Sequence, residues 1–151
     1  MSPEWLLFAC SSLRNLYFIV PKIRLFELDP EMNSSRKDDI SFIFEGLCAV
    51  HDFLITENWY IFMFSSAKLN TKKTLKALIG LGAFAGTFDF NEEKSHIYMI
   101  PRADLLKEGT ASEINLATDS RIKDIPIDKC FSFHLSNAFE NPDGNVVFEV
   151  C

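Results

Sequence analysis

The segment Val50-His51-Asp52-Phe53-Leu54-Ile55-Thr56-Glu57-Asn58-Trp59-Tyr60-Ile61-Phe62 begins with a histidine before a short apolar run, and a polar pair separates that run from an aromatic-rich one. Such a pattern predicts a β-hairpin led by an imidazole. The arrangement returns in Phe133-His134-Leu135-Ser136-Asn137-Ala138-Phe139-Glu140-Asn141-Pro142-Asp143-Gly144-Asn145-Val146-Val147-Phe148. In both segments a Glu-Asn pair begins six positions after the histidine. The sequence therefore predicts two similar hairpins, each led by a histidine.

The composition is that of a globular protein. The 151 residues fit one domain by length, and 48% of them are hydrophobic, which is enough to build a core. The 15 phenylalanines favour strands and apolar cavities. A net charge of −6 argues against a general nucleic-acid surface, so no nucleic-acid partner is expected.

The cysteines and the apolar runs bear on the cellular compartment in which the protein lies. Four cysteines are widely spaced without a CxxC pair, which favours a reducing compartment over a disulfide framework or a zinc site. No apolar run reaches the roughly 18 residues of a membrane span. The apolar run Trp5–Cys10 is too short for a signal-peptide core and is predicted to be a buried strand.

Several further runs have the alternation of strands. Between residues 13 and 28, Ile23 and Leu25 alternate with Arg24 and Phe26, and residues 40–44 and 95–102 are also strand-like. Residues 103–124 are polar and are predicted to form an irregular surface excursion.

Residues 71–81 change from a strand-like to a helical pattern. The apolar side chains recur at i, i+3 and i+4, with lysines beside them. The apolar members are Leu75, Leu78 and Ile79, and the basic ones are Lys72, Lys73 and Lys76. This pattern predicts one short basic amphipathic helix, which either packs on a sheet at the surface or rests on a membrane.

Short strands, frequent turns and a repeated hairpin indicate an all-β fold built of repeats. At roughly 40–50 residues per blade, 151 residues make about three blades of a propeller. Closed propellers have about four to eight blades. We therefore expect residues 1–151 to form part of a larger propeller domain.

The histidines are the candidate metal ligands. His51 and His134 each lead an apolar strand, where a buried neutral imidazole needs a partner for its lone pair. A metal ion is one such partner, and imidazole ligands suit Fe, Zn or Cu. A hydrogen-bonded core or surface histidine is the alternative, and His96 is expected to be of that kind. Two ligands alone would not hold a metal, so others must come from elsewhere.

The acidic neighbours of these histidines are not expected to act as acids or bases. Asp52 is expected to cap or orient backbone, and the carboxylates of Glu57 and Glu140 are expected to be solvated at turns. The sequence shows no Ser-His-Asp or Cys-His arrangement of catalytic residues. Cys48 lacks a basic neighbour in the sequence that would lower the pKa of its thiol.

Four segments together resemble a known family. Residues 50–58 resemble the H-D-F-x-I-T-x-N signature of the carotenoid oxygenases, and residues 133–140 resemble the F-H-x-x-N-A-[FWY] signature of that family. Ile97–Arg102 matches its I-x-[LV]-[IL]-P-R strand, and Leu78–Ala83 is similar to the apolar loop of the bacterial branch that cleaves apocarotenoids. The resemblance runs from about residue 16 to the end of the chain, in the same order.

The resemblance implies a seven-bladed propeller that carries Fe(II) on its axis, held by four histidines from different blades. His51 and His134 match two of them, and the other two, with the glutamates that orient the ligands, have no counterpart in this sequence. The resemblance also implies that residues 71–81 belong to an apolar patch that dips into membranes.

The implied reaction is cleavage of a carbon–carbon double bond of a carotenoid or apocarotenoid with O₂, giving two carbonyl products. The protein would supply an apolar tunnel and no catalytic residue beyond the metal ligands. Two other hypotheses stay open: a catalytically inactive lipid- or partner-binding β module, and a different metalloprotein in which Cys130 or an aspartate completes the site. The sequence leaves open which substrate and bond are used, and whether the protein lies in the cytoplasm, in a plastid or at a membrane surface.

Overall fold

The computed structural model describes residues 6–11, 22–28, 40–44, 50–90, 94–105 and 113–151. The chain divides into two compact units. The first comprises Met1–Gly46 and Pro101–Arg121, and the second comprises Leu47–Ile100 and Ile122–Cys151. The strand expected between residues 13 and 20 lies outside the described residues.

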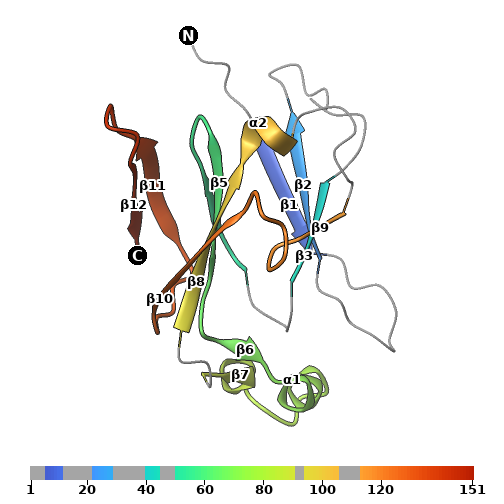
Figure 1. Cartoon of the computed structure of the whole chain (residues 1–151). Helices are drawn as coiled ribbons and strands as arrows, with labels where there is room; N and C mark the ends of the chain where they lie inside the picture. The colour runs from blue at the N-terminus through green and yellow to red at the C-terminus, as the bar shows by residue number, and fades with distance from the viewer. Residues whose placement is uncertain (1–5, 12–21, 29–39, 45–49, 91–93, 106–112) are drawn as a thin grey trace. The chain divides into compact units, whose positions relative to one another are not determined.

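Strands dominate the described part of the chain (Figure 1). The strands are β1 (Leu6–Ser11), β2 (Lys22–Leu28), β3 (Ile40–Ile43), β4 (Phe53–Ile55), β5 (Trp59–Phe64), β6 (Lys68–Leu69), β7 (Phe88–Asp89), β8 (Lys94–Pro101), β9 (Glu113–Asn115), β10 (Lys123–Asp128), β11 (Leu135–Glu140) and β12 (Val146–Val150). The helical segments are α1 (Thr71–Leu78), the 3₁₀ turn η1 (Phe84–Thr87) and the single turn α2 (Arg102–Leu105).

The first unit contains one four-stranded sheet with the order β1-β2-β3-β9. Ile23 and Leu25 of β2 are buried, as their alternation predicted, and they share the core with Phe42 of β3. β9 pairs with β3 in parallel, and the Lys22 ammonium forms an ion pair with the Glu113 carboxylate across the sheet.

The second unit is built on a four-stranded sheet with the order β10-β8-β5-β4. β4 and β5 form the predicted first hairpin, in which Leu54 pairs with Ile61. Tyr60, Ile61 and Phe62 of β5 have no exposed surface. Consecutive residues of a strand point to opposite faces, so β5 is covered on both sides.

β11 and β12 form the predicted second hairpin, which closes through the turn after Glu140. Gly144 in this turn has a φ of 80°, a conformation that glycine adopts at little cost. Leu135 of β11 joins Leu54, Ile61 and Met99 in one apolar cluster. The two predicted hairpins therefore share a core, although they are far apart in the sequence.

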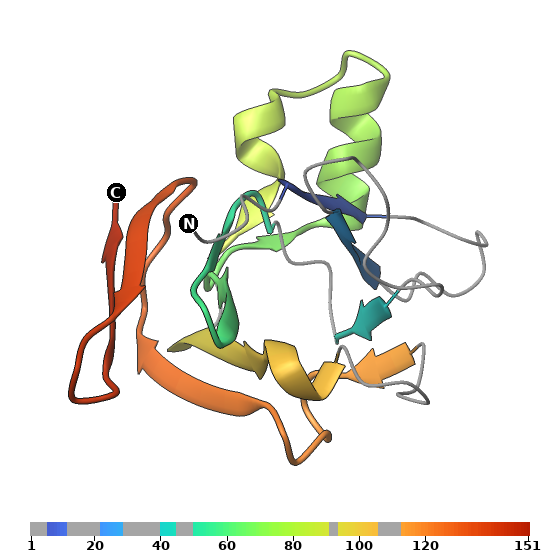
Figure 2. The same ribbon diagram turned by 90° about the horizontal axis from the view of Figure 1, so that it is seen from above.

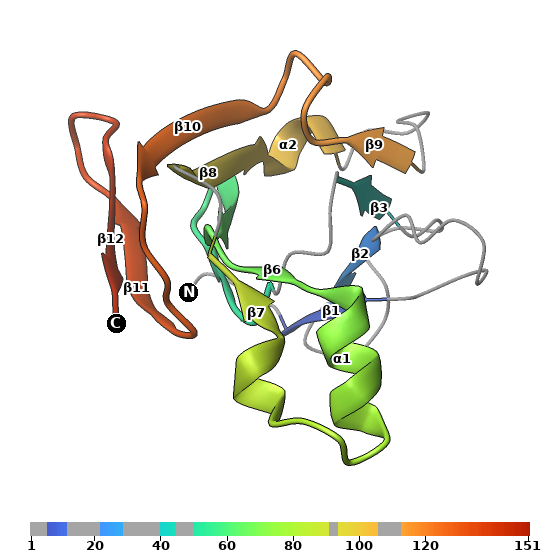
Figure 3. The ribbon, with the colours of Figure 1, turned by 90° about the horizontal axis from the view of Figure 1, so that it is seen from below.

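The predicted helix is present as α1, but it ends at Leu78 rather than Leu81. The Leu81 N–H donates to the Lys76 carbonyl and the Gly80 N–H to the Ala77 carbonyl, and Gly80 has a φ of 78°. This is a Schellman motif, in which a glycine in the left-handed conformation ends the helix. α1 and η1 stand side by side and project from the β6–β7 ribbon (Figure 2 and Figure 3).

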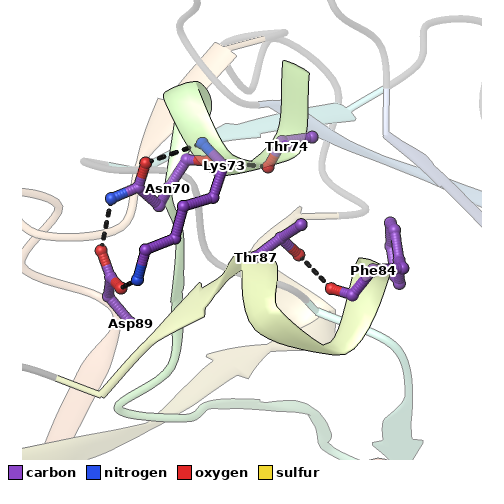
Figure 4. A network of polar contacts seen from close by, with 6 residues as sticks. All are labelled: Asn70, Lys73, Thr74, Phe84, Thr87 and Asp89. Atoms are coloured by element: carbon purple, nitrogen blue, oxygen red, sulfur yellow. Dashed lines mark hydrogen bonds and ion pairs between the residues drawn. The ribbon is translucent and has the colours of Figure 1, made fainter. Parts of the chain in front are cut away.

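A polar network fastens α1 to β7 (Figure 4). The Asn70 side chain accepts from the Lys73 N–H at 3.1 Å as an N-cap and donates to the Asp89 carboxylate at 2.6 Å. The Lys73 ammonium donates to the other Asp89 oxygen, and these two bonds lower the pKa of Asp89, with the Lys73 bond the larger cause.

The prediction of an irregular excursion over residues 103–124 is wrong for part of that segment. Its described residues include α2 at one end, β9 in the middle and the start of β10. Short elements of this kind depend on pairing with distant strands, here β3 and β8. The three residues of β9 hold one apolar side chain, that of Ile114, which is too little for a recognisable local pattern.

Candidate metal centre

The two histidine-led hairpins bring their histidines into contact. His51 lies two residues before β4, and His134 lies directly before β11. Their ring centres are 5.2 Å apart, with an interplanar angle of 87°. Phe133 also meets the His51 ring edge to face, at 5.4 Å. Both imidazoles are exposed in this chain, in contrast to the buried setting that the sequence suggested.

The separation of the two rings fits ligation of one metal ion. With a metal–nitrogen distance of about 2.1 Å, a bound imidazole has its ring centre roughly 3.2 Å from the ion. Two such rings in neighbouring coordination positions have centres roughly 4.5–5.3 Å apart. The observed 5.2 Å between His51 and His134 lies in that range, and imidazole nitrogens suit iron, zinc or copper.

The described residues hold no group of three or more His, Cys, Asp or Glu side chains able to bind a metal. His96 is elsewhere, in the middle of β8, where its Nδ1 lies 2.7 Å from the Asp124 carboxylate. His96 is therefore paired with another side chain, as the sequence predicted. The thiol of Cys130 is free and half-buried.

Asp52 links the two histidine-bearing segments. Its Oδ1 accepts from the Phe53 N–H at 2.8 Å, and its Oδ2 accepts from the Leu135 N–H at 2.9 Å. Oδ2 is also 3.9 Å from the Nδ1 of His134, which is beyond hydrogen-bond distance. The expectation that Asp52 orients backbone is confirmed, and one of the two backbones belongs to the other hairpin.

Glu140 makes a second link between the hairpins. Its carboxylate accepts from the Asn58 N–H and from the Asn58 side-chain amide, both at 2.8 Å. The prediction that this carboxylate is only solvated is therefore wrong. The repeated Glu-Asn pair was the signal that could have found it, since Asn58 of the first pair binds Glu140 of the second.

The backbone of His134 is held by its own hairpin. Its carbonyl accepts from the Cys151 N–H at 3.1 Å. The Ser132 hydroxyl lies 2.7 Å from the same carbonyl and 2.6 Å from that of Cys151, and can donate to one of them at a time. His134 is thereby fixed at the point where the paired part of the hairpin begins.

Aromatic rings connect the histidine pair to η1. From Phe84, edge-to-face contacts lead to Phe88 at 6.0 Å, and from Phe88 to Phe131 at 6.2 Å. Phe131 meets Phe133 at 4.6 Å, and Phe133 is the residue that touches His51. Separations of 4.5–7 Å between ring centres are those of interacting aromatic pairs. This path could not be predicted from the sequence, because it joins rings from separate segments.

The residues expected to contact a membrane lie on α1 and at its end. No residue of α1 is buried, and the exposed fraction of the residue is 61% for Leu75, 74% for Leu78 and 63% for Ile79. Leu81 and Phe84 beyond the helix are exposed to a similar degree. Lys72 and Lys76 are exposed on the same helix, while Lys73 is paired with Asp89.

In the described structure, none of the α1 residues is buried against a sheet. Among the residues that the structure describes, no helix combines the length and apolar character needed to cross a membrane.

The short four-stranded sheets and the likeness to solved apocarotenoid oxygenase structures define the chain as part of a β-propeller. The chain belongs to the retinal pigment epithelial membrane protein (RPE65) family, the family of the carotenoid oxygenases, whose family model matches residues 7–151. The resemblance noted in the sequence is therefore confirmed.

Relatives agree with this assignment. The apocarotenoid-15,15'-oxygenase of Synechocystis sp. is 29% identical over 130 residues, which are 85% of this chain and 22% of that protein. The structure of cobalt-substituted Synechocystis apocarotenoid oxygenase matches 97% of this chain with a TM-score of 0.65 and 26% identity. A chimera of that enzyme with RPE65 matches 97% with a TM-score of 0.66 and 27% identity. The chain spans about a quarter of the length of these solved relatives, 25% in both cases.

Proposed function

We propose that this sequence contributes two iron ligands, His51 and His134, to a non-haem Fe(II) dioxygenase that cleaves a carbon–carbon double bond of a carotenoid or apocarotenoid. The observation that carries the proposal is the contact between the two imidazoles, whose ring centres are 5.2 Å apart. Membership of the carotenoid oxygenase family and the relation to an apocarotenoid oxygenase support the substrate class.

The bound Fe(II) would supply the binding and activation of O₂, and both oxygen atoms would end in the two carbonyl products. The residues of this chain would hold neutral imidazole nitrogens toward the ion and surround the polyene with apolar groups. Oxidative cleavage of this kind needs no protein acid or base, which agrees with the structural use of the Asp52 carboxylate. Further ligands would come from outside the described residues.

The aromatic path supports a route for an apolar substrate. Phe84 is 64% exposed beside α1, and the edge contacts from it lead through Phe88, Phe131 and Phe133 to His51. A polyene is a long apolar molecule and gains free energy by leaving water for such surroundings, at about 25 cal/mol per Å² of buried apolar surface. We infer that these phenylalanines guide the substrate toward the metal.

The exposed side chains of residues 71–81 support contact with a membrane surface, where carotenoids dissolve. Leu75, Leu78 and Ile79 would enter the interface, and Lys72 and Lys76 would face the head groups. Lys73 would add its charge beside them while it stays paired with Asp89. Such an amphipathic segment binds a membrane from one side without crossing it.

Iron binding tests the proposal directly. The full-length product of the gene that contains this sequence should bind one Fe(II) after anaerobic loading. His51→Ala and His134→Ala should each lower the iron content strongly. His96→Ala is the matched control. The His96 imidazole, on β8, pairs with Asp124 of β10, so this substitution should leave the iron content unchanged. With O₂ and an apocarotenoid, only the protein that retains iron should release carbonyl products.

Other results would favour the other hypotheses. A full-length product without stoichiometric iron would overturn the proposal in favour of a lipid- or partner-binding β module. Loss of metal in Cys130→Ala but not in His134→Ala would point to a different metalloprotein. Two further histidine motifs in the coding sequence around this segment are expected, and their absence would refute the proposal.

Sedimentation with phosphatidylcholine vesicles, with and without phosphatidylserine, tests the membrane contact. The double variant Leu78→Glu, Ile79→Glu should abolish binding of the full-length product. Ile125→Glu is the control, because Ile125 is an exposed apolar residue of β10 outside the segment. Equal binding by all three proteins would refute the membrane role of residues 71–81.

A further inference from the structure

We propose that Asp52 and Glu140 are positioning residues, which lock the two histidine-bearing hairpins together and so set the separation of His51 from His134. The proposal rests on the ligand roles proposed above. It assigns a task to two carboxylates that the reaction itself does not use. Each carboxylate belongs to one hairpin and receives its hydrogen bonds, wholly or in part, from the other.

Asp52 acts at the histidine end. It follows His51 directly in the chain, and the N–H that it receives from the other hairpin is that of Leu135, the residue after His134. One carboxylate therefore ties together the two backbones immediately next to both imidazoles. Its second oxygen accepts from the Phe53 N–H at 2.8 Å, which fixes the orientation of the carboxylate itself.

Glu140 acts at the other end of the hairpins. It lies at the end of β11, and both of its bonds come from Asn58, at the turn between β4 and β5. The direction is reversed, since Asp52 reaches from the first hairpin to the second and Glu140 from the second to the first. Links at two separated points prevent both sliding and rotation of one hairpin against the other.

Apolar packing alone would not give this precision. Leu54 and Leu135 hold the hairpins in a common core, but hydrophobic contact has no preferred direction. Hydrogen bonds to a carboxylate are directional and are roughly twice as strong as bonds between neutral groups. Metal coordination tolerates errors of about 0.5 Å, so directional links beside the ligands matter more than the packing.

The chemistry of the links explains why both residues are acids. Each carboxylate accepts two N–H groups, one on each oxygen. A side-chain amide has one oxygen and one NH₂ group, so it would face one of the two N–H donors with another donor. Asp52→Asn and Glu140→Gln therefore keep the size of the side chain and lose one of the two hydrogen bonds that each carboxylate accepts.

The test measures metal binding and backbone protection separately. Co(II) is the probe in the full-length product, because its visible spectrum reports the coordination geometry. Asp52→Asn should weaken Co(II) binding roughly 10- to 100-fold and alter the spectrum, as changes to groups that orient metal ligands do. Glu140→Gln should have a smaller effect, since it acts further from the imidazoles. Asp143→Asn, an exposed acid in the turn of the second hairpin, is the control and should bind Co(II) normally.

Asp52→Glu separates positioning from charge. It retains the negative charge but moves the carboxylate by one methylene, so it should lose as much affinity as Asp52→Asn. Normal affinity in Asp52→Glu with reduced affinity in Asp52→Asn would mean that charge alone matters, and it would overturn the positioning role.

Hydrogen exchange distinguishes failure of this proposal from failure of the ligand roles. Asp52→Asn should speed amide exchange in peptides that contain Phe53 and Leu135, with or without metal. Normal Co(II) binding by Asp52→Asn, while His134→Ala loses the metal, would overturn the positioning role and leave the ligand roles intact. Unchanged exchange in these peptides would overturn the lock even if His51 and His134 proved not to bind metal.

Discussion

Replacing Ser95 with alanine should destabilise the second unit. Ser95 has no exposed surface, and its hydroxyl accepts from the Ser66 N–H at 3.0 Å and from the Cys130 N–H at 3.1 Å. It also lies 2.9 Å from the Cys130 carbonyl, to which it donates. One side chain of β8 therefore fastens two segments, one of which leads directly into Phe131 and Phe133.

The size of the effect follows from the partners that alanine would leave behind. The Ser66 N–H keeps a longer bond to the Cys130 carbonyl, at 3.4 Å, but the Cys130 N–H loses the acceptor that the hydroxyl provides. A buried donor without a partner costs about 1–3 kcal/mol, and Cys130 is only partly buried. We therefore expect Ser95→Ala to lower the free energy of unfolding by about 1 kcal/mol, the lower end of that range.

Urea unfolding followed by tryptophan fluorescence measures this change. Ser136→Ala is the control, because Ser136 is an exposed residue of β11 and surface substitutions usually change stability by less than about 0.5 kcal/mol. Amide exchange at Cys130 should also become faster in Ser95→Ala. If Ser95→Ala were as stable as Ser136→Ala, the hydroxyl would not be supporting the Cys130 segment, and the reasoning would be wrong.

Three further predictions concern the core, the helix end and a charge pair. Ile61→Ala removes a fully buried side chain of β5 and should cost about 2–5 kcal/mol in urea unfolding, whereas a loss under 1 kcal/mol would contradict its central place in the core. Gly80→Ala should cost about 1–2 kcal/mol because of its φ of 78°, whereas Gly86→Ala, the control without positive φ or close neighbours, should not destabilise the protein. The lowered pKa of Asp89 means that its bond to Lys73 stabilises the fold above the ordinary carboxyl pKa of 3.8, and that this contribution is lost as the pH falls through the lowered pKa. Lys73→Gln should therefore raise the pKa of Asp89 toward 3.8 in an NMR titration, and an equal shift in the control Lys72→Gln would contradict the pairing.

The local elements could be predicted because their patterns lie within a few residues. The alternation around Ile23 and Leu25, the polar pair between two apolar runs, and the leucine and lysine spacing of residues 71–81 all specify structure through neighbours in the chain. The histidine signatures likewise pointed to the family that the comparison of the whole chain confirmed. The sequence pattern placed the end of the helix at Leu81, three residues too late. The helix ends earlier because the N–H groups of Gly80 and Leu81 bond back to its last carbonyls.

The pairing of β9 with β3 could not be read from the sequence, since each strand is short and the partner lies far away in the chain. The hydrogen bonds between the two hairpins could not be predicted for the same reason. Asp52 and Leu135 are 83 positions apart, and Asn58 and Glu140 are 82 positions apart. The sequence by itself determined two hairpins with a histidine at the start of each. Only the tertiary structure decided that the two imidazoles meet, because directional bonds between remote residues, and not local propensity, bring them together.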